Sequence, residues 1–122
     1  MSRPLSPHLQ IYRLPLTALL SITHRITGVA LALGLLGLVV IVVAIAYDRA
    51  GFTAIQGFLN GLFGQVILFV WLLALFLHFC HGIRHLLWDV MTGFDRERLT
   101  RHSQWELAAA LGLTVLSWLL LR

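Results

Sequence analysis

The chain has 122 residues, of which 59% are hydrophobic and 11% are charged. About a quarter of the residues of a soluble domain are charged, so the composition excludes an ordinary soluble domain and indicates a small integral membrane protein. The net charge is +4 at pH 7, but the arginines lie in flanks and loops. We therefore attribute the positive charge to membrane topology and predict no nucleic-acid binding.

We predict an all-α integral membrane protein with three transmembrane helices in a single domain, residues 1–122. The spans are expected at about residues 16–47, 57–89 and 104–121. Pro15 suits the first turn of the first helix, because the N–H that proline lacks has no partner there. The apolar core of the first span, 28–47, has the roughly 20 residues needed to cross a bilayer.

Polar segments separate the predicted spans. Residues 48–56 are expected to form a short loop, and residues 92–103 a longer polar connection rich in arginine and acidic residues. The third span is short for a bilayer crossing, which favours little tilt or cover by a partner.

The arginine distribution predicts the orientation in the membrane. Arg3 and Arg13 precede the first span, and Arg96, Arg98 and Arg101 lie in 92–103. The 48–56 loop and the C-terminus each have one arginine. The N-terminus and the 92–103 connection should therefore face the cytoplasm, or the matrix of a mitochondrion.

Two groups of polar and ionisable residues interrupt the apolar spans on this inner side. The first group consists of Ser21, His24 and Arg25. The second consists of His78, His81, Arg84 and His85, followed by Asp89. Ionisable groups at membrane depth are costly and by default indicate function. At 1.5 Å per residue, both His24 and His78 lie roughly 14 Å from their helix ends.

Histidine and arginine together suit a haem or a quinone. Imidazole is a common axial ligand of haem iron, and cations can offset the haem propionates. The residues that fit this description are His24, His78, His85, Arg25 and Arg84. Ser21 and Arg25 lie one helical turn apart and could donate hydrogen bonds to quinone carbonyls.

Simpler interpretations remain open for several of these residues. A membrane histidine can form a hydrogen bond across a helix interface, and an arginine near a helix end can reach lipid head groups. We interpret His81 and His102 as interfacial residues and Cys80 as a small packing residue. The third span contains no histidine, so two haem ligands from this chain would have to be His24 with His78 or His81.

Three motifs resemble the cytochrome b subunits of succinate dehydrogenase, the larger of its membrane anchors. Arg3–Tyr12 reads RPLSPHLQIY and Ser21–Gly28 reads SITHRITG, and together they resemble the first signature of the family. His78–Asp89 reads HFCHGIRHLLWD and resembles the second signature. The resemblance covers essentially the whole chain.

The resemblance implies a role in respiratory complex II, which oxidises succinate to fumarate in the tricarboxylic acid cycle and reduces ubiquinone. Flavoprotein and iron–sulfur subunits would carry the soluble chemistry, and this chain with a smaller membrane anchor would bind haem b and form the quinone site. His78 matches the axial ligand of the haem iron, and the second axial histidine is expected from the smaller anchor. His24, Arg25 and His85 match the propionate side. Ser21 and Arg25 match the quinone site.

The resemblance implies a multi-pass location in the bacterial cytoplasmic membrane or the mitochondrial inner membrane, and no activity for the chain alone. Alternatives are a structural anchor without haem and the anchor of a fumarate reductase. A small histidine-based proton channel is a remote alternative.

Overall fold

The computed structural model describes residues 13–90 and 96–121, and every element in this part is an α-helix. The helices are α1 (Leu16–Tyr47), α2 (Arg49–Asn60), α3 (Leu62–Val90) and α4 (Arg96–Leu120). The predicted all-α class is therefore confirmed. Within the described residues, α1 and α3 are the helices that are long and apolar enough to cross a membrane. A third crossing stays a prediction.

The expected loop at 48–56 is wrong, because α2 occupies most of it. Asp48 ends α1 and begins α2: its N–H donates to the carbonyl of Ala44, and its Oδ1 accepts from the N–H of Gly51 at 2.9 Å. Aspartate is a favoured N-cap residue because its side chain satisfies a free N–H of the first turn. A single residue thus joins the two helices, and α3 begins at Leu62, not near residue 57.

The polar connection predicted at 92–103 is also shorter than expected. α4 already begins at Arg96, so the charged residues from there to Ser103 form its first turns. A charged sequence can remain helical where the helix leaves the apolar layer, because water and head groups can solvate its side chains. The hydropathy pattern therefore indicates the apolar part of α4 and not its start.

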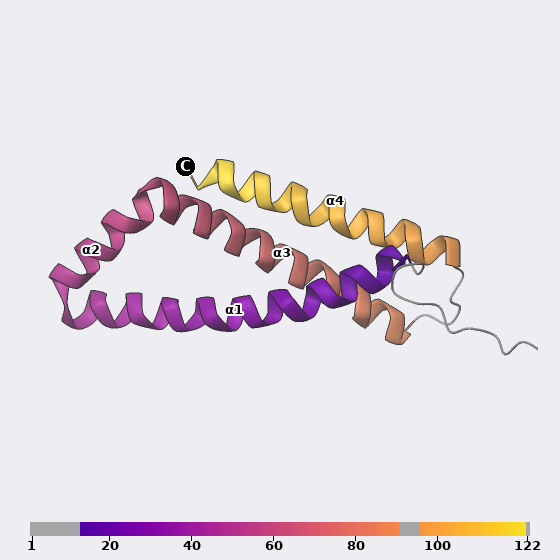
Figure 1. Cartoon of the computed structure of the whole chain (residues 1–122), viewed down its shortest axis with the longest axis horizontal. Helices are drawn as coiled ribbons and strands as arrows, with labels where there is room; N and C mark the ends of the chain where they lie inside the picture. Colours follow the sequence, from indigo (N-terminus) through magenta and orange to yellow (C-terminus); the bar gives the residue numbers. More distant parts are fainter. Residues whose placement is uncertain (1–12, 91–95, 122) are drawn as a thin grey trace, which may run out of the picture.

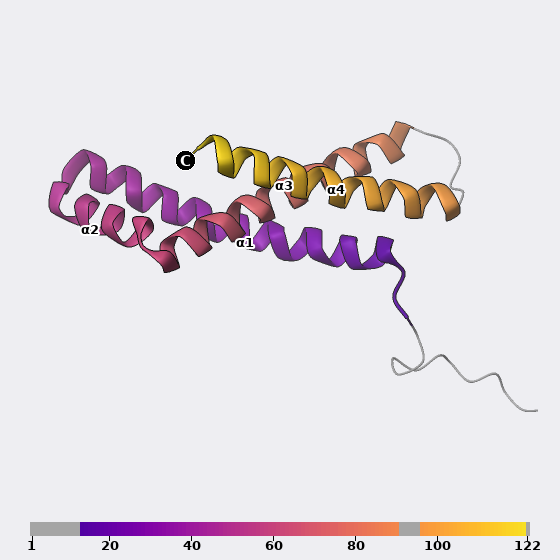
Figure 2. The same ribbon diagram turned by 90° about the horizontal axis from the view of Figure 1, so that it is seen from above.

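α3 is the central helix and packs against both α1 and α4 (Figure 1). The start of α1, the end of α3 and the start of α4 lie at the same end of the molecule in both views (Figures 1 and 2). α2 lies at the opposite end and connects α1 to α3. This topology brings the two polar groups of the sequence together at one end.

Small and polar residues form most of the buried interior, while large apolar side chains cover the outside. The buried small and hydroxyl-bearing residues include Ala44, Ala74, Ala110, Ser103 and Thr114. Membrane helices approach closely through such residues, because lipid gives no advantage to burying large side chains between them. The exposed leucine, valine and isoleucine side chains along α1 and α3 are suited to contact lipid or a partner helix.

Gly34 of α1 allows a close approach to α3. A Cβ atom built on Gly34 would overlap Nε1 and Cε2 of Trp71, both in the indole of α3. No other residue type fits at Gly34 unless the rigid indole ring moves. By contrast, a Cβ atom at Gly37, on the next turn of α1, meets nothing within 4 Å.

We expect Gly34→Ala to destabilise the packing of α1 on α3 by about 1–3 kcal/mol, the usual cost of overpacking. Gly37→Ala is the matched control, and its added methyl should be neutral or slightly stabilising because alanine favours a helix. Thermal or detergent unfolding of the purified protein measures both. Equal stability of the two variants would contradict the close contact.

Candidate functional site

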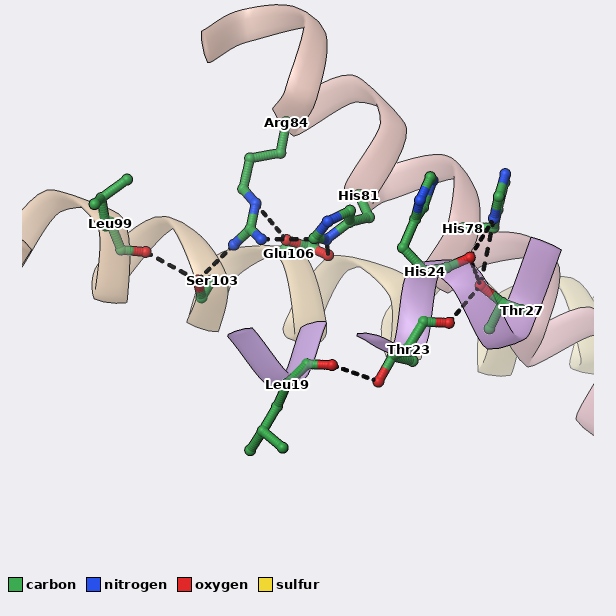
Figure 3. Close-up of polar contacts among 10 residues, drawn as sticks. All are labelled: Leu19, Thr23, His24, Thr27, His78, His81, Arg84, Leu99, Ser103 and Glu106. Carbon is green, nitrogen blue, oxygen red and sulfur yellow. Dashed lines mark hydrogen bonds and ion pairs between the residues drawn. The ribbon is translucent and has the colours of Figure 1, made fainter. Parts of the chain in front are cut away.

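Four histidine rings gather where the start of α1 meets the end of α3 (Figure 3 shows three of them). The ring of His24 stacks on that of His78, with centroids 4.0 Å apart and an angle of 8° between the planes. His24 also lies 4.8 Å from His81 and 5.9 Å from His85, and the last two rings are 4.7 Å apart. The two polar groups of the sequence therefore form one cluster.

The backbone of α1 orients the ring of His78. Its Nδ1 lies 3.1 Å from the carbonyl oxygen of His24 and 3.3 Å from Oγ1 of Thr27. Because a carbonyl oxygen only accepts, Nδ1–H of His78 donates to the His24 carbonyl, while the Thr27 hydroxyl can donate to the carbonyl of Thr23 at 2.9 Å. This leaves Nε2 with its lone pair free, as in a histidine that binds a metal through one nitrogen and is oriented through the other.

Gly28 leaves room beside this ring. A Cβ atom at Gly28 would lie 3.2 Å from Cε1 of His78, tighter than an ordinary contact. The half-buried ring of His78 therefore packs closely against the backbone of α1 at Gly28.

α4 contributes a buried carboxylate to the cluster. Oε1 of Glu106 lies 2.7 Å from Nδ1 of His81, and the side chains of the two residues expose 3% and 2% of their surface. Nε2 of His81 is buried and has no hydrogen-bond partner within the described residues. Nη2 of Arg84 also lies near Nδ1, at 3.2 Å, but the carboxylate is closer and only accepts. The proton of this imidazole therefore sits on Nδ1, and its Nε2 is a free acceptor.

Arg84 completes a buried charged group between α3 and α4. Its Nε lies 2.9 Å from Oε2 of Glu106, and Nη1 donates to Oγ of Ser103 (Figure 3). The guanidinium carbon lies 4.6 Å from the centre of the Trp88 ring, a cation–π distance. The pairing with Glu106 offsets the cost of burying each charge alone.

These contacts correct two interpretations of the sequence. His81 is not interfacial, because only 1% of its surface is exposed. Arg84 does not reach lipid head groups, because Glu106 binds it inside the protein. Both corrections are needed because Glu106 binds His81 and Arg84, and the sequence motifs do not include Glu106. The available signal was a single carboxylate close to the apolar part of α4, at a depth where it needs a partner.

Of the other predicted site residues, Ser21, Arg25 and Asp89 lie outside the four histidine rings, and His85 is the exposed member of that cluster. Ser21 is half-buried and Arg25 is exposed on the surface of α1. His85 is exposed and makes edge contacts to the rings of His81 and Trp88, the latter at 5.2 Å. Asp89 is exposed at the last turn of α3. The exposed members can therefore contact a ligand or a partner outside this chain.

The geometry fits a haem better than a bare metal ion. No three histidine, cysteine or acidic side chains of residues 13–90 and 96–121 are placed to hold a metal together. Haem iron needs only axial protein ligands, and His78 has a free Nε2 and a fixed ring. His24 is stacked on the face of His78, so in this arrangement it offers no nitrogen opposite Nε2 of that ring.

Comparison with known proteins gives the family. The family model described as the succinate dehydrogenase/fumarate reductase transmembrane subunit matches residues 1–121. The chain is 39% identical to the succinate dehydrogenase cytochrome b556 subunit of Paracoccus denitrificans, over 95% of this chain and 89% of that protein.

Two further relatives agree with this match. The cytochrome b556 subunit of Rickettsia felis is 37% identical over 95% of this chain and 90% of that protein. The cytochrome b560 subunit of Reclinomonas americana is 36% identical over 98% of this chain and 87% of that protein. With the family model matching nearly every residue, the chain belongs to the family of succinate dehydrogenase/fumarate reductase transmembrane subunits.

Proposed function

We propose that this chain is the membrane anchor of a succinate:ubiquinone oxidoreductase that binds haem b and helps to form the ubiquinone site. The observation that carries the proposal is the ring of His78, which is held by the His24 carbonyl at 3.1 Å with Nε2 free. The relatives are named as cytochrome b subunits, which supports haem b as the ligand. When bound, this haem would supply one-electron chemistry beside the quinone.

We propose His78 as one axial ligand of the haem iron and a histidine of the smaller anchor subunit as the other. The stacking of His24 on His78 supports this assignment, because two rings in a parallel stack do not hold one iron between them. His81 is less suited, because its ring is enclosed between α3 and α4 and leaves no open face for a haem. A ligand from a partner also agrees with the half-exposed position of His78.

The remaining site residues have roles that follow from charge and position. His24 stacks on the proposed iron ligand, the ring of His85 lies 5.9 Å from that of His24, and Arg25 follows His24 in α1; these three residues would offset the haem propionates. Ser21 and Arg25 would donate hydrogen bonds to the quinone, and the exposed guanidinium of Arg25 would stabilise negative charge on its oxygen. The quinone and the haem would share this end of the helices.

The fold supports the same setting. We propose that α4 is the third span of a single domain and that the N-terminus faces the cytoplasm or matrix, as the arginine distribution predicts. The flavoprotein and iron–sulfur subunits would then dock on the side where the cluster lies. The family includes fumarate reductase subunits, but the relatives above are named as subunits of succinate dehydrogenase, which favours succinate oxidation.

Substitution of His78 tests the haem assignment. In the complex purified with its partner subunits, we expect His78→Ala to abolish the α-band of low-spin haem b, because the iron loses one axial ligand. His102→Ala is the matched control, since His102 is an exposed histidine of α4. A full haem b spectrum in His78→Ala would overturn the ligand assignment. A complex that lacks haem before any substitution would indicate a structural anchor.

Substitution of Arg25 tests the quinone site. We expect Arg25→Ala to lower succinate:ubiquinone reductase activity by roughly tenfold to a hundredfold, because a hydrogen bond to a charged group contributes about 1.5–3 kcal/mol. Succinate oxidation by a soluble electron acceptor should not change, because that reaction bypasses the quinone. Arg13→Ala removes another exposed arginine from the same end of the chain and should have no effect. Unchanged ubiquinone reduction in Arg25→Ala would remove the proposed role.

A further inference from the structure

His81 has a buried nitrogen that its own surroundings leave unused. The side chain exposes 2% of its surface, and Nε2 has no hydrogen-bond partner in the described part of the chain. Buried polar groups in proteins nearly always have a hydrogen-bond partner, so a partner is expected in the assembled protein. Glu106 occupies the other nitrogen, Nδ1, at 2.7 Å. The free acceptor is therefore fixed in place by a residue of another helix.

Two imidazoles of the proposed haem site lie beside His81. The ring centroid of His85 is 4.7 Å from that of His81, and His24 is the one that also stacks on His78. The ring centroid of His24 lies 4.8 Å from that of His81 and 4.0 Å from that of His78. A haem held by Nε2 of His78 would be bound in the plane of that ring, so the His24 ring stacked on its face would lie beside the haem. Nε2 of His81 is a free acceptor beside this ring, and we expect a rotation of the His24 side chain to bring one of its N–H groups to it. A chain of hydrogen bonds would join Glu106, His81 and His24.

We infer that Glu106 is a positioning residue of the haem site, which acts through His81 to hold His24 beside the haem. The carboxylate holds the proton of His81 on Nδ1, and Nε2 accepts a hydrogen bond from the ring of His24. Arg84 keeps the carboxylate in place through its contact at 2.9 Å. This inference rests on the proposed function, because it requires haem beside His78. It assigns a role to α4, which lies outside the motifs that resemble the family.

The midpoint potential of the haem, measured by optical redox titration of the purified complex, tests this role. Glu106→Gln keeps the shape of the side chain and removes its negative charge. The reduced haem carries one positive charge less than the oxidised haem, so the loss of a nearby negative charge favours reduction. We expect the equilibrium constant for reduction to rise about tenfold, which is about 59 mV for one electron.

Two matched variants separate positioning from a general effect on packing. Glu106→Asp keeps the negative charge, so its equilibrium constant for haem reduction should stay within threefold of that of the unsubstituted complex. Thr114→Val removes a buried hydroxyl of α4 that donates only to the Ala110 carbonyl of its own helix, and it should leave the potential unchanged. If Thr114→Val shifted the midpoint potential as much as Glu106→Gln does, the effect would come from the packing of α4, and the proposal would be overturned.

A double-mutant cycle tests whether the effect passes through His81. In a His81→Phe background the hydrogen-bond chain is absent, so Glu106→Gln should then shift the equilibrium less than threefold. An equal shift in both backgrounds would show that Glu106 acts only as a charge and would overturn the proposal. If Glu106→Gln does not assemble, His81→Phe alone decides, since an unchanged potential in that variant also contradicts the chain.

The failures of the two proposals are distinguishable. Absence of the haem α-band from the unsubstituted complex would contradict the proposed function. A normal α-band together with an unchanged potential in Glu106→Gln would contradict only the role of Glu106.

Discussion

The buried ion pair between Arg84 of α3 and Glu106 of α4 is the contact on which the arrangement of the site depends. Their side chains expose 5% and 3% of their surface, so each charge relies on the other for compensation. Breaking a buried pair by removing one partner costs roughly 3–5 kcal/mol, because the remaining charge is left without a counterion. The pair therefore fixes α4 against the end of α3 at one register. The buried contact of the carboxylate with His81 extends this constraint toward α1.

A neighbouring face of the same stretch of α3 is fixed by α1. His78 points to α1 and is held by the backbone carbonyl of His24, while Gly28 leaves space for its ring. Residues 78–85 thus contact both neighbouring helices, and the histidines three and seven positions apart face different surroundings. His81 is enclosed, His78 is half-buried and His85 is exposed. A partner subunit or a ligand can therefore approach His78 and His85 but not His81.

Much of the fold could be predicted from hydropathy, but the ends of the helices could not. The apolar runs of α1 and α3 indicate membrane-length helices, because only helices satisfy every backbone group within one segment in lipid. The segment around Asp48 has fewer apolar residues and so favours a loop by hydropathy, although an N-capping aspartate begins α2 there. The first turns of α4 could not be predicted from hydropathy either, because their charged residues lower the hydropathy without interrupting the helix.

From the sequence by itself it could be predicted that two groups of histidine and arginine lie on the same side of the membrane. Helical rise and the distribution of arginines were sufficient for that prediction, and the motifs of His24 and His78 indicated the family. Only the tertiary structure decided how these residues pair. Which side chains are buried depends on the helix that covers them, and α4 covers His81 and Arg84 with the carboxylate of Glu106. Spacing along one helix carries no information about a counterion on another.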